Sequence, residues 1–426
     1  MIRKKAFAVV AVSLLLVAGY VYWTLCGSRA EVRGRVVLCI PVYGQSLALG
    51  EEAVRVTDFD QLRAFHGGRI VTENIDGRFG YFDLDATKQQ VKKLLHRQNR
   101  SFELSVYGMA ELLAGQLGED TLICIFPGGK GTTDLANLGK GSEPYNRLLC
   151  DLMEACSYVT SNGGRFLVPA ICWMQGESDI ADYPGTDYKA MLRQFSRDIN
   201  DHVKAITGQQ ESARLICYQT NALTRGNRFS QHDYVCCEVG VPQAMMELIR
   251  DDTLFWASGP TYPYSFAREA IHIDGVSQKR LGTLEGLTAL RLLRNAPRFR
   301  GLVPLQVVAR DSDVVVKMNV PCPPLRLDTL AVRAARHYGF SVVTPSGRDV
   351  ATGVAVSGDE VTVRCSQSPV GCKVRYAVNG EMQKSGSEHG PRGNLRDSQG
   401  DAHTVSVCGK VYPLHNWCYQ FEELVR

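Results

Sequence analysis

The stretch Val42-Tyr43-Gly44-Gln45-Ser46-Leu47 decides the fold prediction. It follows an apolar run at residues 36–40, which has the length and composition of a buried strand. A strand that ends in Gly-Gln-Ser places a serine at the carboxyl edge of a sheet, where open α/β folds keep their active sites. We therefore predict that Ser46 is a nucleophile. Such a serine needs a base, donors for an oxyanion and a substrate pocket.

Strand and helix patterns alternate regularly in the part of the chain that follows. Apolar runs of strand length occur at residues 122–126, 166–174, 214–218 and 254–256. Segments with helical periodicity lie between and after them, at residues 106–117, 145–160, 188–206, 241–250 and 277–293. This alternation predicts a parallel sheet covered by helices on both faces. Residues 51–100 are polar and irregular, and predict a long functional loop with one charged helix near 87–97.

The pattern changes near residue 300, where short β-rich runs begin to alternate with turn residues. This predicts a separate β-sandwich-like domain of a usual domain size. We place the boundaries at residues 1–30 for an N-terminal segment, 31–298 for the α/β domain and 299–426 for the β-rich domain.

The N-terminal segment has the pattern of an export signal. Basic residues at positions 3–5 precede a nearly continuous apolar run at residues 6–25, which is long enough to span a bilayer. Aromatic residues at its outer end favour an uncleaved signal-anchor in the membrane, and cleavage near Cys26 is the alternative. We expect the rest of the chain to be exported, either membrane-anchored at the cell envelope or secreted.

The net charge and the cysteine positions indicate which partners, disulfides and metal sites to expect. The net charge of +4 over 426 residues gives no reason to expect a nucleic-acid partner. Fourteen cysteines in an exported chain suggest disulfides. The cysteines at 39, 124, 172 and 217 lie in predicted central strands, where we expect free thiols. The pairs 365 with 372 and 408 with 418 are better disulfide candidates, and the connectivity stays open. No cysteine or histidine spacing predicts a metal site.

The base and the oxyanion donors have candidates at the same sheet edge. His272 lies after the last predicted strand and before the last helix. Glu269, three residues earlier, is a candidate to orient the imidazole, and Asp274 is a second one. The candidate donors to an oxyanion are the Ser46 N–H, an N–H of the glycine turn at residues 128–131 and the Gln175 side-chain amide.

These blocks resemble a known family. Gly44-Gln45-Ser46, the turn ending in Lys130-Gly131-Thr132, the block Trp173-Met174-Gln175-Gly176-Glu177-Ser178-Asp179 and the segment around His272 are similar to the blocks of SGNH-type carbohydrate O-acetylesterases. The subgroup is that of the sialate O-acetylesterases, and the resemblance covers roughly residues 35–295.

The resemblance implies an SGNH-hydrolase-like fold and a role for each block. In the family, the serine of Gly-Gln-Ser is the nucleophile, which corresponds to Ser46, and the base corresponds to His272. The oxyanion donors correspond to Gly131 and Gln175, whereas Glu177 and Asp179 look structural. Two departures are Leu47, where the family has asparagine, and Glu269, where the family often has aspartate.

The expected function is removal of O-acetyl groups from a glycan, with O-acetylated sialic acid as the first substrate and no cofactor. Alternatives are an acetylxylan esterase or another polysaccharide deacetylase. An alternative of another class is a membrane-tethered glycan-binding protein whose esterase site has decayed, a reading that Leu47 keeps open. A carboxylate substrate would need a cation, and the candidates are Arg225, Arg228, Arg268 and Lys130. Aromatic residues for a sugar platform, or for the core, are Trp256, Tyr262 and Tyr264.

Overall fold

The computed structural model describes nine stretches of the chain. They are residues 30–73, 79–81, 102–182, 187–221, 228–229, 234–236, 240–267, 271–381 and 384–426. The predicted N-terminal anchor and the charged helix near 87–97 lie outside the described residues. In the stretches that are described, no helix is both long and apolar enough to cross a membrane.

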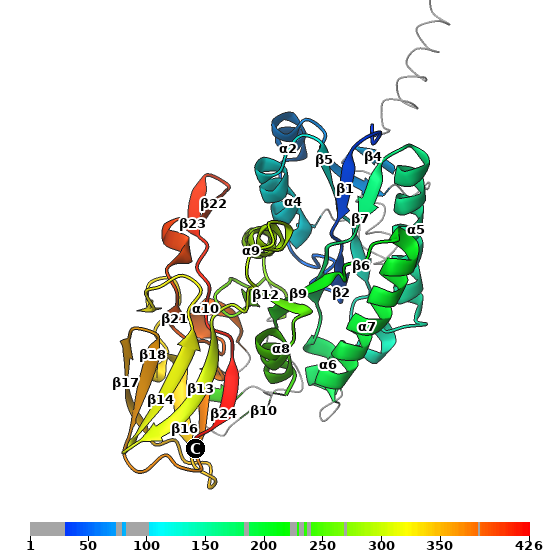
Figure 1. Ribbon diagram of the computed structural model, residues 1–426. Coiled ribbons are helices and arrows are strands. Elements are labelled where there is room, and N and C mark those ends of the chain that lie inside the picture. The colour runs from blue at the N-terminus through cyan, green and yellow to red at the C-terminus, as the bar shows by residue number, and fades with distance from the viewer. Residues whose placement is uncertain are drawn as a thin grey trace, which may run out of the picture.

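A mostly parallel sheet forms the centre of the α/β part, as Figure 1 shows. Three of its strands are interrupted: β1 (Val36–Cys39) is followed by β2 (Val42–Gly44), β5 (Thr121–Cys124) by β6 (Pro127–Gly129), and β7 (Arg165–Leu167) by β8 (Ala170–Met174). The first halves form one ladder, β4-β3-β5-β1-β7, and the second halves form another, β12-β9-β8-β2-β6. Pro41 and Pro169 lie at two interruptions, because proline has no N–H for the ladder.

The strands at the two edges complete this sheet. β9 (Arg214–Gln219) and β12 (Phe255–Pro260) continue it beyond β8 in parallel register. β3 (Ile70–Glu73) pairs in parallel with β5, and β4 (Phe79–Tyr81) pairs antiparallel with β3. The parallel α/β fold predicted from the alternating pattern is therefore confirmed. Since all the central strands run the same way, their carboxyl ends meet at one edge.

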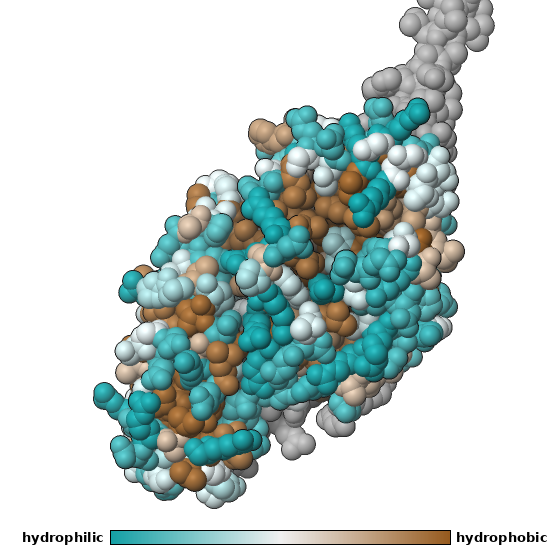
Figure 2. All heavy atoms as spheres, in the orientation of Figure 1, coloured by the Kyte–Doolittle hydropathy of each residue, from teal (hydrophilic) through white to brown (hydrophobic). Residues whose placement is uncertain are grey.

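Helices cover both faces of the sheet (Figure 1). α4 (Ser105–Gln116) and α9 (Gly275–Leu293) pack together on one face, and α2 (Phe59–His66) contacts α4. On the other face lie α5 (Glu143–Ser161) and α7 (Tyr188–Thr207), with α8 (Gly240–Asp251) and the short α6 (Glu177–Asp182) beside them. Hydrophilic residues cover the outer side of α7 in Figure 2, as expected for an amphipathic helix that buries one side.

The region after residue 300 consists mainly of antiparallel strands. One sheet contains β13 (Val303–Arg310), β14 (Asp313–Asn319), β18 (Glu360–Cys365) and β17 (Ala351–Ser357), and another contains β16 (Phe340–Val343), β19 (Lys373–Tyr376) and β24 (Phe421–Leu424). β22 (Thr404–Val407) and β23 (Lys410–Pro413) form a hairpin, and β15 (Arg326–Leu327) pairs with β21 (Leu395–Arg396). β16 also contacts β17 and β18. This agrees with the predicted β-sandwich-like region.

The β-rich region is joined to the α/β part at several places. β20 (Asn379–Glu381) pairs with β11 (Tyr234–Cys236), which itself pairs with β10 (Arg228–Phe229). α10 (Gly386–His389) lies beside Tyr264, whose carbonyl accepts a hydrogen bond from the Ser387 N–H. The Arg280 guanidinium of α9 contacts the rings of both Tyr264 and Tyr412.

The three aromatic residues proposed as a sugar platform are buried. Trp256, Tyr262 and Tyr264 are 5%, 0% and 4% exposed. The Tyr262 hydroxyl donates to the Cys418 carbonyl at 2.9 Å, so this ring belongs to the joint between the two parts. The core alternative is therefore the correct one.

The cysteines of the β-rich region are free thiols, so the two suggested disulfides are not formed. Cys408 lies exposed at the hairpin turn, whereas Cys418 is buried, with its Sγ donating to the Tyr419 carbonyl. The Cys365 Sγ donates to the Val363 carbonyl. The thiols of Cys124, Cys172 and Cys217 are buried and free in the central strands, as predicted.

Candidate functional site

Ser46 lies at the carboxyl end of β2, between the neighbouring strands β6 and β8. The turn after it is closed by backbone hydrogen bonds, among them Glu51 N–H to the Ser46 carbonyl at 3.0 Å. Gly44 lets this strand end approach β8, because a Cβ there would lie 1.9 Å from the Met174 carbonyl oxygen. The serine is 4% exposed, so its hydroxyl sits in a largely enclosed position.

His272 lies within hydrogen-bond distance of Ser46. Its Nε2 is 2.8 Å from the Ser46 Oγ, although the two residues are 226 positions apart. The histidine precedes α9, and its carbonyl accepts from the Ala267 N–H at 2.7 Å. The residue as a whole is 7% exposed. The predicted nucleophile and base are thus brought together in the geometry that proton transfer requires.

The other imidazole nitrogen faces a carboxylate that the sequence did not single out. Nδ1 of His272 is 3.3 Å from Oε2 of Glu52, in the loop that follows Ser46. Glu269, the first predicted partner, lies outside the described residues. Asp274, the second, caps α9 by accepting from the Ser277 N–H at 2.8 Å. The only sequence signal for Glu52 is its proximity to the nucleophile, which does not predict the direction of its side chain.

Two of the predicted oxyanion donors, the N–H groups of Ser46 and Gly131, belong to adjacent residues. A Cβ added to Gly131 would lie 3.9 Å from the Ser46 Cβ, so the two residues are adjacent. Among the described residues, neither the Ser46 N–H nor the Gly131 N–H donates a hydrogen bond. Two neighbouring N–H groups without partners are what an oxyanion hole requires.

The Gln175 side chain is at the site but already bonded. Its Nε2 donates to the Thr133 carbonyl at 3.2 Å and to Oδ2 of Asp179, and its Oε1 accepts from the Tyr188 hydroxyl at 2.8 Å. Both amide hydrogens are therefore used within the fold. Gln175 braces the loop after Gly131, and its role as an oxyanion donor stays a prediction.

The acidic residues of the same block hold loops together. Asp179 also accepts from the Leu135 N–H at 3.0 Å, and burial raises its pKa to about 6. Glu177 accepts from the Tyr218 hydroxyl, and burial raises its pKa as well. Gln45 Oε1 accepts from the N–H groups of Gly176 and Ser178, both at 3.3 Å. These contacts agree with the interpretation that Glu177 and Asp179 are structural residues.

Leu47 belongs to the core rather than to the site's polar network. Its side chain is 1% exposed. Its carbonyl accepts from the Gln278 Nε2 of α9 at 2.9 Å, which orders the turn without an asparagine side chain. The substitution at position 47 therefore leaves the Ser46–His272 pair intact.

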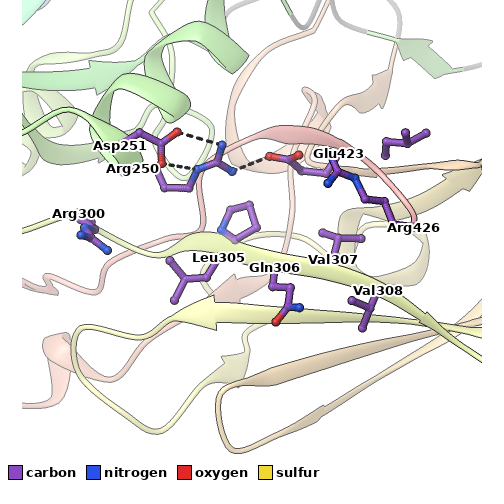
Figure 3. A pocket seen from close by; sticks show the side chains of 11 residues that line it. Arg250, Asp251, Arg300, Leu305, Gln306, Val307, Val308, Glu423 and Arg426 are labelled. Carbon is purple, nitrogen blue, oxygen red and sulfur yellow. Dashed lines mark hydrogen bonds and ion pairs between the residues drawn. The ribbon is translucent and has the colours of Figure 1, made fainter.

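A cavity of about 600 Å³ lies elsewhere, where α8, β13 and β24 meet (Figure 3). In Figure 3 the Arg250 guanidinium lies between Asp251 and Glu423, to which it is bonded. Apolar side chains, including Leu305 and Val307, line the other side of the cavity. The cavity contains neither Ser46 nor His272. Within the residues that the structure describes, no cluster of three His, Cys, Asp or Glu residues is arranged to hold a metal ion.

Comparison with known proteins relates this fold to carbohydrate esterases. No protein-family model and no curated protein sequence matches the chain. Among solved structures, the carbohydrate acetylesterase XAC1771 from Xanthomonas citri is 16% identical, with a TM-score of 0.55 over 92% of this chain and 80% of that one. NanS is 14% identical, with a TM-score of 0.41 over 62% of this chain and 99% of its own. The chain shares the fold of the XAC1771 structure, and the parallel sheet with helices on both faces agrees with the fold predicted from the sequence.

Proposed function

We propose that this chain is a serine esterase that removes O-acetyl groups from a carbohydrate. The observation that carries the proposal is the 2.8 Å separation of the Ser46 Oγ and His272 Nε2, beside two N–H groups that have no partner among the described residues. A lone serine is a weak nucleophile, and an adjacent imidazole activates it. The carbohydrate acetylesterase activity of XAC1771, which shares the fold, is consistent with this chemistry.

The proposed reaction proceeds in two halves. The Ser46 Oγ attacks the acetyl carbonyl carbon while His272 Nε2 takes the hydroxyl proton. The N–H groups of Ser46 and Gly131 hold the oxyanion, and collapse of the intermediate breaks the bond to the sugar oxygen, which receives the proton from His272. Water then attacks the acetyl-serine, again giving a proton to His272, and acetate leaves as Ser46 recovers its hydrogen.

O-acetylated sialic acid is the substrate that we propose first. Its support is the resemblance of the block at Trp173–Asp179 to that of sialate O-acetylesterases. A sialic acid carries a carboxylate, and Lys130, next to Gly131, offers an exposed cation at the site. Arg225 and Arg268 lie outside the described residues, and the side chain of Arg228 is not described. Acetylxylan or another acetylated polysaccharide is the alternative substrate.

The experiment that tests the function measures acetate release by the full-length chain. Mucin that carries O-acetylated sialic acid and acetylated xylan are the two substrates, and Ser46→Ala is the control variant. Release from mucin that the variant abolishes supports both the mechanism and the sialate substrate. Release from xylan alone supports the mechanism and changes the substrate. Undiminished release by the Ser46→Ala variant would exclude Ser46 as the nucleophile.

A fluorophosphonate probe separates the esterase from a glycan-binding protein with a decayed site. Such a probe labels an activated serine covalently, whereas an unactivated hydroxyl does not react at a comparable rate. Labelling of the wild type, absent in Ser46→Ala and strongly reduced in His272→Ala, would support the enzyme. No labelling of a folded chain would support the binding protein.

We also propose that the chain is exported and tethered by its N-terminal segment. The support is the apolar run at residues 6–25 behind three basic residues. Membrane fractionation tests this: extraction by detergent but not by alkaline carbonate is expected for an anchor. A soluble exported chain that begins near residue 27 would indicate cleavage instead.

A further inference from the structure

The orientation of His272 depends on what its second nitrogen contacts. A histidine base keeps Nε2 ready to accept a proton only if Nδ1 carries the other proton, and a carboxylate bonded to Nδ1 fixes that tautomer. In this structure Oε2 of Glu52 is the carboxylate oxygen placed 3.3 Å from Nδ1. The two side chains are 9% and 22% exposed, so the contact is partly shielded from water.

We propose that Glu52 is the positioning residue that orients His272, completing a Ser46–His272–Glu52 chain of hydrogen bonds. The inference rests on the proposed esterase function. It assigns the orienting role to the loop after the nucleophile, rather than to Glu269 in the segment before the histidine. In this arrangement the Ser46 hydroxyl donates to Nε2 of His272, and the Nδ1–H of His272 donates to the Glu52 carboxylate.

The backbone at Glu52 is held in a costly conformation. Its φ is +63°, in the left-handed region that residues other than glycine rarely adopt. Such a conformation is strained for a residue that has a Cβ, and it persists where the surrounding structure enforces it, commonly at functional sites. Neighbouring turns fix it, since the Glu51 N–H donates to the Ser46 carbonyl at 3.0 Å and the Ala53 N–H donates to the Gly50 carbonyl at 3.0 Å. The serine and Glu52 therefore belong to one rigid turn.

A buried carboxylate anchors the segment that follows Glu52. Oε2 of Glu103 accepts from the N–H groups of Val56 and Thr57 at 2.9 and 2.8 Å, and its Oε1 accepts from the Thr57 hydroxyl at 2.5 Å. Lys279 of α9 donates to the same hydroxyl at 3.2 Å, and pairs with Glu111 of α4 at 2.5 Å. These bonds connect the loop that carries Glu52 to the two helices behind it.

The start of α9 presses against the same loop. A Cβ on Gly275 would lie 1.8 Å from the Val54 carbonyl oxygen, so only glycine allows this approach. Gly275 is three residues after His272, and Val54 is two residues after Glu52. The two partners of the proposed bond are thus carried by backbone segments in direct contact, which fixes their separation.

Among the described residues, the other carboxylates near His272 do not fill this role. Asp274 is used as the cap of α9. Glu177 lies near enough to interact electrostatically with His272, but it is fully buried and bonded to the Tyr218 hydroxyl. Burial raises the pKa of Glu177 and so disfavours its charged form. Glu52, which is partly solvated, is the carboxylate placed at Nδ1.

The test compares Glu52→Gln and Glu52→Asp with the matched variant Glu269→Gln in the full-length chain. The probe is hydrolysis of 4-nitrophenyl acetate, with Ser46→Ala as the blank. We expect Glu52→Gln to lower kcat/KM about a hundredfold, less than the ~10⁴-fold seen when a fully buried triad aspartate is replaced. Glu52→Asp should recover part of the loss, and Glu269→Gln should lose less than Glu52→Gln does.

The split between kcat and KM separates positioning from a merely structural role. A misoriented imidazole slows proton transfer without changing how the small acetyl ester binds, so Glu52→Gln should lose kcat and keep KM within about twofold of the wild type. Melting temperatures of all variants identify any loss caused by unfolding. A folded Glu52→Gln with unchanged kcat would overturn the inference, as would a larger loss in Glu269→Gln. Activity that survives in Ser46→Ala would instead overturn the proposed function.

Discussion

Gln219 binds the backbone of Gln420 with both ends of its side-chain amide. Its Nε2 donates to the Gln420 carbonyl at 2.9 Å, and its Oε1 accepts from the Gln420 N–H at 2.7 Å. Asn221 adds a third bond, from its Nδ2 to the Gln420 Oε1 at 2.5 Å. Gln219 ends β9 at the sheet edge that carries Ser46, and Gln420 directly precedes β24. The β-rich region is thus bonded to the sheet edge that carries Ser46.

Replacing Gln219 by alanine should destabilise the whole chain. The change leaves the N–H and the carbonyl of Gln420 buried without these partners, and each such group costs about 1–3 kcal/mol. We expect the free energy of unfolding to fall by about 3 kcal/mol, measured by denaturant titration, together with lower esterase activity.

Gln209→Ala is the matched control, because Gln209 binds the N–H and carbonyl of Val168 in the same way within the α/β part. This variant should lose stability while the joint with the β-rich region stays intact, so its activity per folded molecule should be unchanged. If Gln219→Ala also kept full activity per folded molecule, the joint would not contribute to the site.

Gly44→Ala tests the close approach of the strand that ends at Ser46. The added Cβ would lie 1.9 Å from the Met174 carbonyl oxygen, which belongs to the backbone of the neighbouring strand. Neither strand can move without displacing Ser46, so we expect a loss of more than about 3 kcal/mol in stability and at least a hundredfold in kcat. Thermal melting and single-substrate kinetics measure both.

Gly118→Ala serves as the comparison, since a Cβ at Gly118 meets no atom within 4 Å. It should leave both quantities unchanged. A Gly44→Ala chain with wild-type melting and kinetics would show that the two strands can separate freely, which would contradict their close packing.

The site residues that could be predicted from the sequence are those that lie next to regular helices and strands. Ser46 and His272 each flank a strand or helix with clear periodicity, so their common edge follows from the α/β alternation. Glu52 sits in a loop with no periodicity, in a left-handed conformation that its residue type does not predict. Its direction is decided by contacts with distant residues, Glu103 and Gly275 among them.

Long-range packing also explains the other differences from expectation. Nothing in the local pattern of Gln175 distinguishes a free amide from one bonded to Thr133 and Asp179. Tyr262 looks the same in sequence whether it is exposed or covered, and the β-rich region covers it. Cys408 and Cys418 likewise differ in burial, because Cys408 lies exposed in the turn between β22 and β23, whereas Cys418 lies beyond the hairpin and is buried. Each outcome depends on elements far apart in the chain.

Glu285 should make the stability of the chain fall as the pH rises. It lies fully buried on α9, and burial raises its pKa to about 8 from an ordinary value of 4.5. The folded state therefore keeps a proton between pH 4.5 and 8 that the unfolded state releases, so this contribution to stability is lost as the pH rises through that range. Glu285→Gln should remove it.

Melting temperatures of wild type and Glu285→Gln, measured from pH 5 to pH 9, check this. At pH 9 the melting temperature of the variant should exceed that of the wild type by several degrees, because a few kcal/mol of stability correspond to a shift of this size. Glu154→Gln, at an exposed position of α5, is the control and should follow the wild type throughout. Parallel curves for wild type and Glu285→Gln would show that Glu285 titrates alike in both states.

Gln175→Ala distinguishes a brace from an oxyanion donor. Removal of the amide leaves the Thr133 carbonyl without this donor, leaves the buried Asp179 with the Leu135 N–H as its remaining donor, and takes an acceptor from the Tyr188 hydroxyl. If Gln175 acts as a brace, the variant should lose about 2–3 kcal/mol of stability, and kcat should fall only as far as disorder of the loop explains. A donor predicts a loss of 10²–10³ in kcat with the melting temperature unchanged. Because both hydrogens are engaged, we expect the first result. Parallel melting and kcat measurements decide, with Gln194→Ala on the exposed face of α7 as the control.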